Sequence, residues 1–131
     1  MSLPYLSEAW RAEAEKRIRA EITPDKMKKI TTSMSNMFLD CPDGKERFLY
    51  FDFKDGALAK LDVGEGEPPK ATFRITGKYE IFAKISRAEL GSQKALMTGK
   101  LKLKGNMIKA LKLASIADRI NKVLAGIDTS Y

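Results

Sequence analysis

The sequence contains no histidine, and Cys41 is the only cysteine among its 131 residues. Histidine is the commonest general base and a frequent metal ligand, so its absence removes the usual basis of acid–base and zinc chemistry. One cysteine without histidine gives no Cys–His nucleophile pair, no zinc ligand set and no intramolecular disulfide. These absences argue against an enzyme and against a bound metal, although catalysis by a lysine or an aspartate stays open.

Long apolar segments and phosphate-binding loops are also missing. No uninterrupted apolar run approaches the ~20 residues of a membrane span, and the charges that begin at Glu8 do not suit a signal peptide. Gly64 and Gly66 lack the spacing and the following helix of a dinucleotide-binding loop. The sequence therefore predicts a cytoplasmic protein without a cofactor.

Positive charge is in excess, with 24 Lys and Arg against 17 Asp and Glu, a net charge of +7. The excess favours nucleic acid, anionic membranes or acidic metabolites without choosing among them. Lys100, Lys102 and Lys104, here called the lysine ladder, could bind phosphates, but a solvated outer strand face is the favoured interpretation. Aromatic residues do not interleave with this ladder, so nucleic-acid binding by base stacking is not expected.

The length of the chain fits one domain over residues 1–131, and its 44% hydrophobic and 31% charged residues are typical of a globular protein. We expect a helical lead-in over residues 7–30 and a core domain over residues 31–125. In the lead-in, Ser7 caps a helix that runs to about Ala20, and Thr23-Pro24-Asp25 starts a short second helix.

Three segments alternate apolar and polar residues, as strands with one buried face do. Residues 46–54 are dense in aromatics, and the Asp55-Gly56 turn joins them to a return strand over residues 57–63. Residues 71–76 alternate in the same way. In the return strand we expect one face to carry Ala57, Ala59, Leu61 and Val63.

The remainder of the core is predicted to contain both helices and strands. Apolar spacing predicts a helix over residues 78–90 and a long amphipathic helix over residues 107–125. Residues 95–104 alternate, so we expect a strand there with Met97, Leu101 and Leu103 on its apolar face. Residues 31–40 fit a helix or a strand. Helices stacked on one face of a mainly antiparallel sheet are the economical arrangement of these elements.

The apolar faces form a large set for so small a sheet. Periodicity alone favours a packed core, although six methionines and small residues such as Gly99 are also compatible with a ligand cavity. The set comprises Phe51, Phe53, Leu61, Phe73, Ile75, Phe82, Met97, Leu101, Leu103, Met107, Leu111, Ile116 and Ile120.

One motif in the last third of the chain is fairly specific. The run from Gly99 through the lysine ladder to Gly105-Asn106 resembles the signature of the sterol carrier protein type 2 domain family. Upstream of this motif, three further segments occur in the order found in the family: Pro42-Asp43-Gly44, the Asp55-Gly56 turn and residues 71–76. The resemblance therefore spans about residues 30–125. The opening residues 6–10 are similar to the helical lead-in of standalone prokaryotic members.

The resemblance implies a strand over residues 32–40 and hence an α+β fold with a five-stranded, mainly antiparallel sheet and helices on one face. It also implies a hydrophobic tunnel between sheet and helices, lined by the apolar set above, with the C-terminal helix as its lid. The implied function is non-catalytic carriage of a fatty acid, fatty acyl-CoA, phospholipid or sterol-like ligand. The lysine ladder would meet ligand head groups or, transiently, an anionic membrane.

The alternative is an accessory module that binds a protein partner or scaffolds a lipid-modifying enzyme. The chain ends at Ser130-Tyr131 rather than at a Ser-Lys-Leu tail, so a peroxisomal location is not expected. The sequence makes no prediction of the oligomeric state.

Overall fold

The computed structural model describes residues 2–131. Its elements, in chain order, are β1 (Leu3–Pro4), α1 (Glu8–Glu21), β2 (Thr32–Leu39), β3 (Arg47–Lys54), β4 (Ala57–Glu65), β5 (Phe73–Lys78), α2 (Tyr79–Ser86), α3 (Ser92–Met97), β6 (Leu101–Lys104), α4 (Met107–Ala125) and β7 (Thr129–Ser130).

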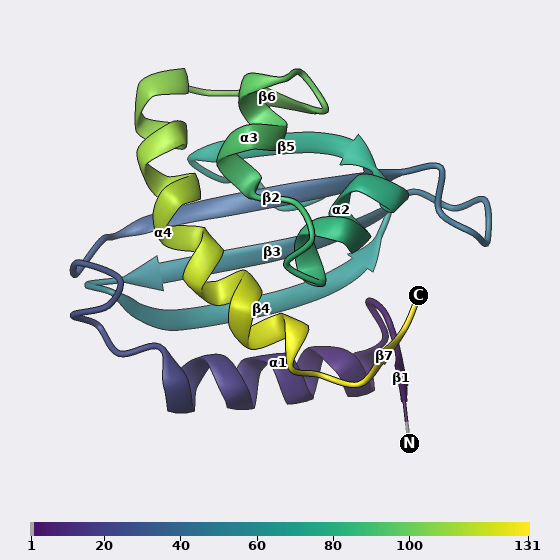
Figure 1. Cartoon of the computed structure of the whole chain (residues 1–131), viewed down its shortest axis with the longest axis horizontal. Coiled ribbons are helices and arrows are strands. Elements are labelled where there is room, and N and C mark those ends of the chain that lie inside the picture. Colours follow the sequence, from purple (N-terminus) through teal and green to yellow (C-terminus); the bar gives the residue numbers. More distant parts are fainter. Residues whose placement is uncertain (1) are drawn as a thin grey trace.

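The main sheet has five strands in the order β4-β3-β2-β5-β6. Three neighbouring pairs are antiparallel, and only β2 and β5 run parallel. Helices α2, α3 and α4 lie over one face of the sheet, and α1 runs beside the edge strand β4 (Figure 1). The predicted α+β fold, with a mainly antiparallel sheet and the C-terminal helix packed over it, is confirmed.

The segment that fitted either a helix or a strand forms β2, the central strand of the sheet. Met34 pairs with Phe51 on the antiparallel side and with Phe73 on the parallel side. Met34 and Phe38 are both buried, with 7% and 0% of their surface exposed. Alternation along a strand places these residues, together with Asn36, on the face that the helices cover.

The expected strand over residues 95–104 is wrong for its first half. Residues 92–97 form helix α3, and only residues 101–104 form strand β6. The N–H of Lys100 donates to the carbonyl of Ala95 at 2.9 Å, and Gly99 has a φ of 76°, which together end the helix as a left-handed glycine does. Ala95 and Leu96 are both buried, a pattern that a strand cannot produce on one face.

Two other helical predictions need correction. Residues 24–29 form turns instead of a second helix, because Lys28 and Lys29 adopt left-handed φ values of 52°. Thr23 still acts as a local cap, since its Oγ1 accepts the N–H of Lys26 at 3.3 Å. Helix α2 ends at Ser86, before the expected residue 90, and Ala88 has a φ of 59°.

A bulge changes which residues of β4 face inward. Asp52 pairs with Lys60 but Phe53 pairs with Leu58, so Ala59 is an extra residue on the β4 side. Leu58 and Leu61 are therefore both buried, whereas Ala59 is exposed. The expected face of Ala57, Ala59, Leu61 and Val63 is wrong because strict alternation fails at the bulge.

Candidate functional site

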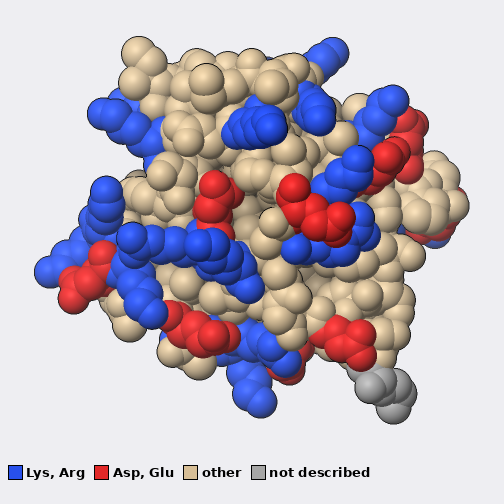
Figure 2. All heavy atoms as spheres, in the orientation of Figure 1, with Lys and Arg blue, Asp and Glu red and all other residues tan. Residues whose placement is uncertain are grey.

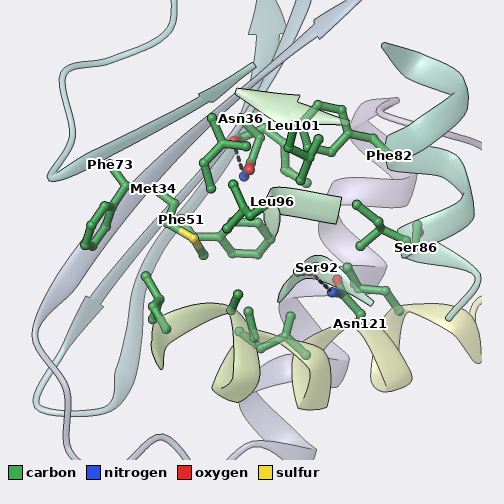
Figure 3. A pocket seen from close by; sticks show the side chains of 18 of the residues that line it. Met34, Asn36, Phe51, Phe73, Phe82, Ser86, Ser92, Leu96, Leu101 and Asn121 are labelled. Atoms are coloured by element: carbon green, nitrogen blue, oxygen red, sulfur yellow. Dashed lines mark hydrogen bonds between the residues drawn. The ribbon is translucent and has the colours of Figure 1, made fainter. Parts of the chain in front are cut away.

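An apolar cavity of about 60 Å³ lies between the sheet and its helical cover. Figure 3 shows side chains from the sheet and from the helices converging on it. None of its lining residues carries a charge. They are Tyr5, Met34, Asn36, Phe38, Leu49, Phe51, Phe73, Ile75, Phe82, Ile85, Ser86, Ser92, Leu96, Leu101, Ala110, Leu113, Ala114, Ala117, Ile120, Asn121 and Leu124.

The sheet supplies one wall of this cavity, chiefly from its three central strands. Met34 of β2 stands between Phe51 of β3 and Phe73 of β5, the residues with which it is in register. Asn36, the polar member of this wall, is buried, and its Nδ2 donates to the carbonyl of Leu49 at 3.2 Å. This bond satisfies one N–H of the amide, and Asn36 is the one polar side chain on an otherwise apolar wall.

Helix α4 supplies the opposite wall with alternating small and large side chains. Ala110, Ala114 and Ala117 lie among Leu113 and Ile120, and all five are buried. Small side chains keep the helix from filling the space above the aromatic rings of the sheet. Asn106 caps the start of α4, because its Oδ1 accepts the N–H of Lys109 at 3.0 Å.

One end of the cavity is polar and involves Tyr5, which follows β1, and Tyr131, which follows β7. The hydroxyl of Tyr131 donates to Oγ of Ser86 at 2.9 Å, and Tyr5 lies close to Ser86. Burial raises the pKa of Tyr5 far above its usual value. Nearby, Nδ2 of Asn121 donates to Oγ of Ser92 at 2.9 Å.

Beyond Tyr5 lies a second, outer hollow of about 370 Å³. Arg47, which lines this hollow, is hydrogen-bonded to Asp43. Cys41, another lining residue, is buried, and its thiol donates to the carbonyl of Phe38 at 3.6 Å. Burial raises the pKa of the Cys41 thiol, which opposes reactivity. Tyr5 lines both spaces and therefore lies between the apolar cavity and this surface hollow.

The structure brings six of the thirteen predicted apolar residues to the cavity: Phe51, Phe73, Ile75, Phe82, Leu101 and Ile120. Five others pack elsewhere. Phe53, Leu61 and Ile116 are buried in the core, and Leu103 and Leu111 are partly buried against it.

The remaining two, Met97 and Met107, do not face inward. Met97 is 69% exposed and Met107 is 46% exposed. Met97 is the last residue of helix α3, so helical spacing and not strand alternation sets the direction of its side chain. Met107 is the first residue of α4 and precedes the first buried residue of that helix. The inward placement of Met97 was inferred from a strand alternation that the chain does not adopt there, and that of Met107 from its place beside the apolar stripe of the helix.

Sequence reasoning missed fifteen lining residues. Nine of these had a signal in the sequence. The apolar stripe of α4 indicated Ala110, Leu113, Ala114, Ala117 and Leu124, and the alternation of β2 and β3 indicated Met34, Phe38 and Leu49. Asn36 occupies a polar position on the same face of β2 as Met34 and Phe38. Among the other six lining residues, only Ile85 had a signal, from its helical spacing. The remaining five are Tyr5, Ser86, Ser92, Leu96 and Asn121.

The lysine ladder lies at the end of the molecule where α3, β6 and the start of α4 meet. Lys102 and Lys104 pair with Thr76 and Arg74 along the uncovered face of the sheet, and Lys100 precedes the strand. Exposed Met97, Met107 and Ile108 flank these lysines in sequence, Ile108 being 70% exposed. Figure 2 shows basic side chains around an otherwise uncharged surface at this end, at the top of the view.

Within residues 2–131, no helix is both long and apolar enough to cross a membrane. Over the same residues, no three His, Cys, Asp or Glu side chains gather as a possible metal site.

The fold and the cavity define an α+β domain that encloses an apolar space beneath its C-terminal helix. The model of the SCP-2 sterol transfer family matches residues 12–118. The chain therefore belongs to this family, which confirms the resemblance seen in the sequence.

Curated relatives support the same family. The chain is 34% identical over 103 residues to non-specific lipid-transfer protein-like 1 of Caenorhabditis elegans, covering 77% of this chain and 84% of that protein. It is 38% identical over 80 residues to an oleate-induced peroxisomal protein of Candida maltosa, spanning 60% of this chain and 61% of the relative. It spans only 25% of the bovine (Bos taurus) hydroxysteroid dehydrogenase-like protein 2, at 32% identity over 109 residues.

Solved structures share the fold at lower identity. A crystal structure of sterol carrier protein 2 superposes with a TM-score of 0.80 at 23% identity, covering 94% of this chain and 98% of that one. A solution structure from Thermus thermophilus, described as possibly a sterol carrier protein, gives 0.82 at 24% identity, covering 99% and 94%.

Proposed function

We propose that this chain is a carrier that binds a hydrophobic, lipid-like molecule in the cavity between its sheet and α4. The observation that supports this most directly is the lining itself, in which aromatic and aliphatic side chains surround a space without any charged group. The relatives add support, since one is named a lipid-transfer protein and another, from Yarrowia lipolytica, a fatty acid-binding protein.

Binding requires the cavity to expand. Its volume of about 60 Å³ is well below the roughly 300–1,000 Å³ of pockets that hold drug-sized ligands. Helix α4 is the element best suited to move, because it packs on the sheet through side chains and shares no backbone ladder with it. A displacement of α4 would enlarge the space without breaking the sheet, as a lid does.

The ligand classes that fit such a space are fatty acids, fatty acyl-CoA, phospholipids and sterol-like molecules. Burial of apolar surface contributes about 25 cal/mol per Å² and has no direction. One methylene more or less changes affinity only modestly. Selectivity among chain lengths is therefore expected to be loose.

A protein-interaction module is the less suited alternative. A groove that receives a partner's helix must present its apolar face to solvent. Here α4 occupies that position, and its inward residues Leu113, Ile120 and Leu124 are each at most 5% exposed. The apolar surface is thus an internal cavity closed by the chain's own helix.

We propose binding without catalysis for this chain, and no catalytic residue is assigned. The hydroxysteroid dehydrogenase-like relative is about four times as long as the matched segment, so the enzymatic part of its name refers to a larger protein. A cytoplasmic location remains our prediction from the sequence, while one relative is named as peroxisomal.

The lead-in and the core domain are proposed to act as one unit over residues 1–131. Trp10, Ala14 and Ile18 of α1 are at most 1% exposed, so the lead-in packs as tightly as the core. Arg11 of the same helix donates to the carbonyl of Leu61 in β4 at 3.3 Å.

A titration with a fluorescent fatty acid tests the proposed cavity. Ala114→Phe would fill the space from α4, and we expect it to reduce affinity by at least about tenfold. Ala125→Phe is the matched control, because Ala125 is exposed at the end of the same helix. Equal affinity of the parent and a folded Ala114→Phe variant would contradict the assignment of the cavity.

Transient contact with an anionic membrane is proposed at the lysine ladder. Each lysine near an anionic bilayer contributes about 1 kcal/mol, and exposed Ile108 and Met97 can enter the interfacial region. Co-sedimentation with phosphatidylglycerol vesicles should exceed that with phosphatidylcholine vesicles and should fall with salt.

Two variants localise this contact. Lys102→Glu is expected to weaken vesicle binding, whereas Lys122→Glu, with an exposed lysine near the other end of α4, should weaken it less. Equal effects of both substitutions would show that vesicle binding depends on the net charge of the protein and not on the lysine ladder.

A further inference from the structure

Four of the five polar side chains that line the cavity, all except Asn36, lie toward one end. Tyr5, Ser86, Ser92 and Asn121 come from the N-terminal segment, the end of α2, the start of α3 and the C-terminal half of α4. Figure 3 shows Ser86, Ser92 and Asn121 on the side of the cavity away from Phe73 and Met34. The cavity therefore has a polar end and an apolar end, and a ligand with one polar group would be oriented by it.

Ser92 and Asn121 retain hydrogen-bonding capacity at this end. Oγ of Ser92 accepts from Nδ2 of Asn121 at 2.9 Å. Within residues 2–131, the Ser92 hydroxyl donates to no protein group and the Asn121 carboxamide oxygen accepts from none. The Ser86 hydroxyl accepts from Tyr131 and lies close to Tyr5. Ser92 and Asn121 thus offer both a donor and an acceptor to a ligand.

The charged side chain that hydrogen-bonds the backbone at this polar end is a carboxylate. Asp118, on α4, accepts the backbone N–H of Ser92 through Oδ1 at 3.1 Å, which places a carboxylate beside the site. Arg87, the residue after Ser86, lies 4.9 Å from the centre of the Tyr131 ring and is paired with Glu89. A ligand carboxylate hydrogen-bonded to Ser92 would lie beside the Asp118 carboxylate, and a nearby like charge disfavours the ionised form. The nearest lysines in sequence, Lys94 and Lys122, are exposed.

We infer that Ser92 and Asn121 hold the polar head of the bound lipid, and that this head is uncharged: a hydroxyl, ester or amide and not a carboxylate. The inference rests on the proposed lipid-binding function and adds to it an orientation and a ligand class. The head group lies between α3 and α4, and the hydrocarbon extends toward Met34 and Phe73.

The test compares three ligands of matched chain length, oleyl alcohol, oleate and 1-octadecene, by displacement of a fluorescent probe at pH 8. We expect oleyl alcohol to bind at least about tenfold more tightly than oleate. Asn121→Leu and Ser92→Ala should each weaken oleyl alcohol by about fivefold and leave 1-octadecene unchanged. Ser115→Ala is the control, since Ser115 is exposed on α4 and does not line the cavity.

Each outcome decides the inference. Retained 1-octadecene binding shows that a variant is folded, so a selective loss of oleyl alcohol supports the site. If oleate binds as tightly as oleyl alcohol, or if Asn121→Leu affects the three ligands alike, the head-group site is overturned while the carrier function stands. If none of the three ligands binds the parent chain, both proposals fall.

Discussion

The hydroxyl of Tyr131, the last residue of the chain, donates a hydrogen bond of 2.9 Å to Oγ of Ser86 at the end of α2. Ser86 is 2% exposed and lines the apolar cavity. The parallel pair of β1 and β7 brings the residues that follow these strands, Tyr5 and Tyr131, together at this point. Tyr131 is thereby connected to the wall of the candidate binding site.

Tyr131→Phe removes this hydrogen bond while keeping the ring. We expect the free energy of unfolding to fall by about 1 kcal/mol, the usual net contribution of one such bond. Urea denaturation of the parent and the variant measures the change. Since the ring contacts with Tyr5 and Arg87 persist in Tyr131→Phe, a loss far above this amount would mean that the hydroxyl has a larger role.

Tyr5 should make stability depend on alkaline pH. Burial raises its pKa in the folded state above the unfolded value of about 10. Its contribution is thus fully present below pH 10 and is lost as the pH rises toward the folded-state pKa. Unfolding free energies at pH 8 and pH 11 should therefore differ more in the parent than in Tyr5→Phe. Equal differences would indicate that Tyr5 is not the group responsible.

Gly105 of the sequence motif cannot accept a side chain without cost. Its φ is 143°, and an added Cβ would lie 3.0 Å from Cδ1 of Phe73. Gly105→Ala should destabilise the fold by about 1–3 kcal/mol, because it combines backbone strain with a clash at a cavity residue. Gly66→Ala is a useful comparison, since Gly66 also has a positive φ but has open space around it. A similar loss in both variants would attribute the effect to φ alone.

Asn106 of the same motif caps the proposed lid. Asn106→Ala removes the acceptor of the Lys109 N–H and should lower the unfolding free energy by about 1 kcal/mol. Asn106→Asp retains an acceptor and should stay near the parent value. Thermal or chemical denaturation distinguishes the two, and a loss equal to that of alanine in the aspartate variant would contradict the capping role.

Much of the fold was predictable because its signals are local. The alternation of residues 46–54 and 71–76 gave strands β3 and β5, and the apolar stripe of residues 107–125 gave α4 with the same bounds. The motif from Gly99 to Asn106 indicated the family, and through it the strand character of residues 32–39. Each of these features is set by neighbours close in sequence.

The errors arose where tertiary packing or a register shift overrode the local pattern. The segment around Met97 alternates in composition but folds as a helix, because tertiary burial of Ala95 and Leu96 together outweighs a strand pattern. The bulge at Ala59 shifts the register of β4, and no turn residue in the sequence announces it.

The sequence by itself determined the family, the order of most elements and the apolar faces of its main strands and helices, since side-chain periodicity and glycine positions encode these directly. Only the tertiary structure decided which apolar residues meet the cavity. Phe51 and Phe53 share one face of β3 with rings 6.2 Å apart, yet Phe51 lines the cavity and Phe53 packs in the core. Periodicity assigns a face, but a cavity forms where distant segments leave space, and contacts such as that of Tyr131 with Ser86 join residues 45 positions apart.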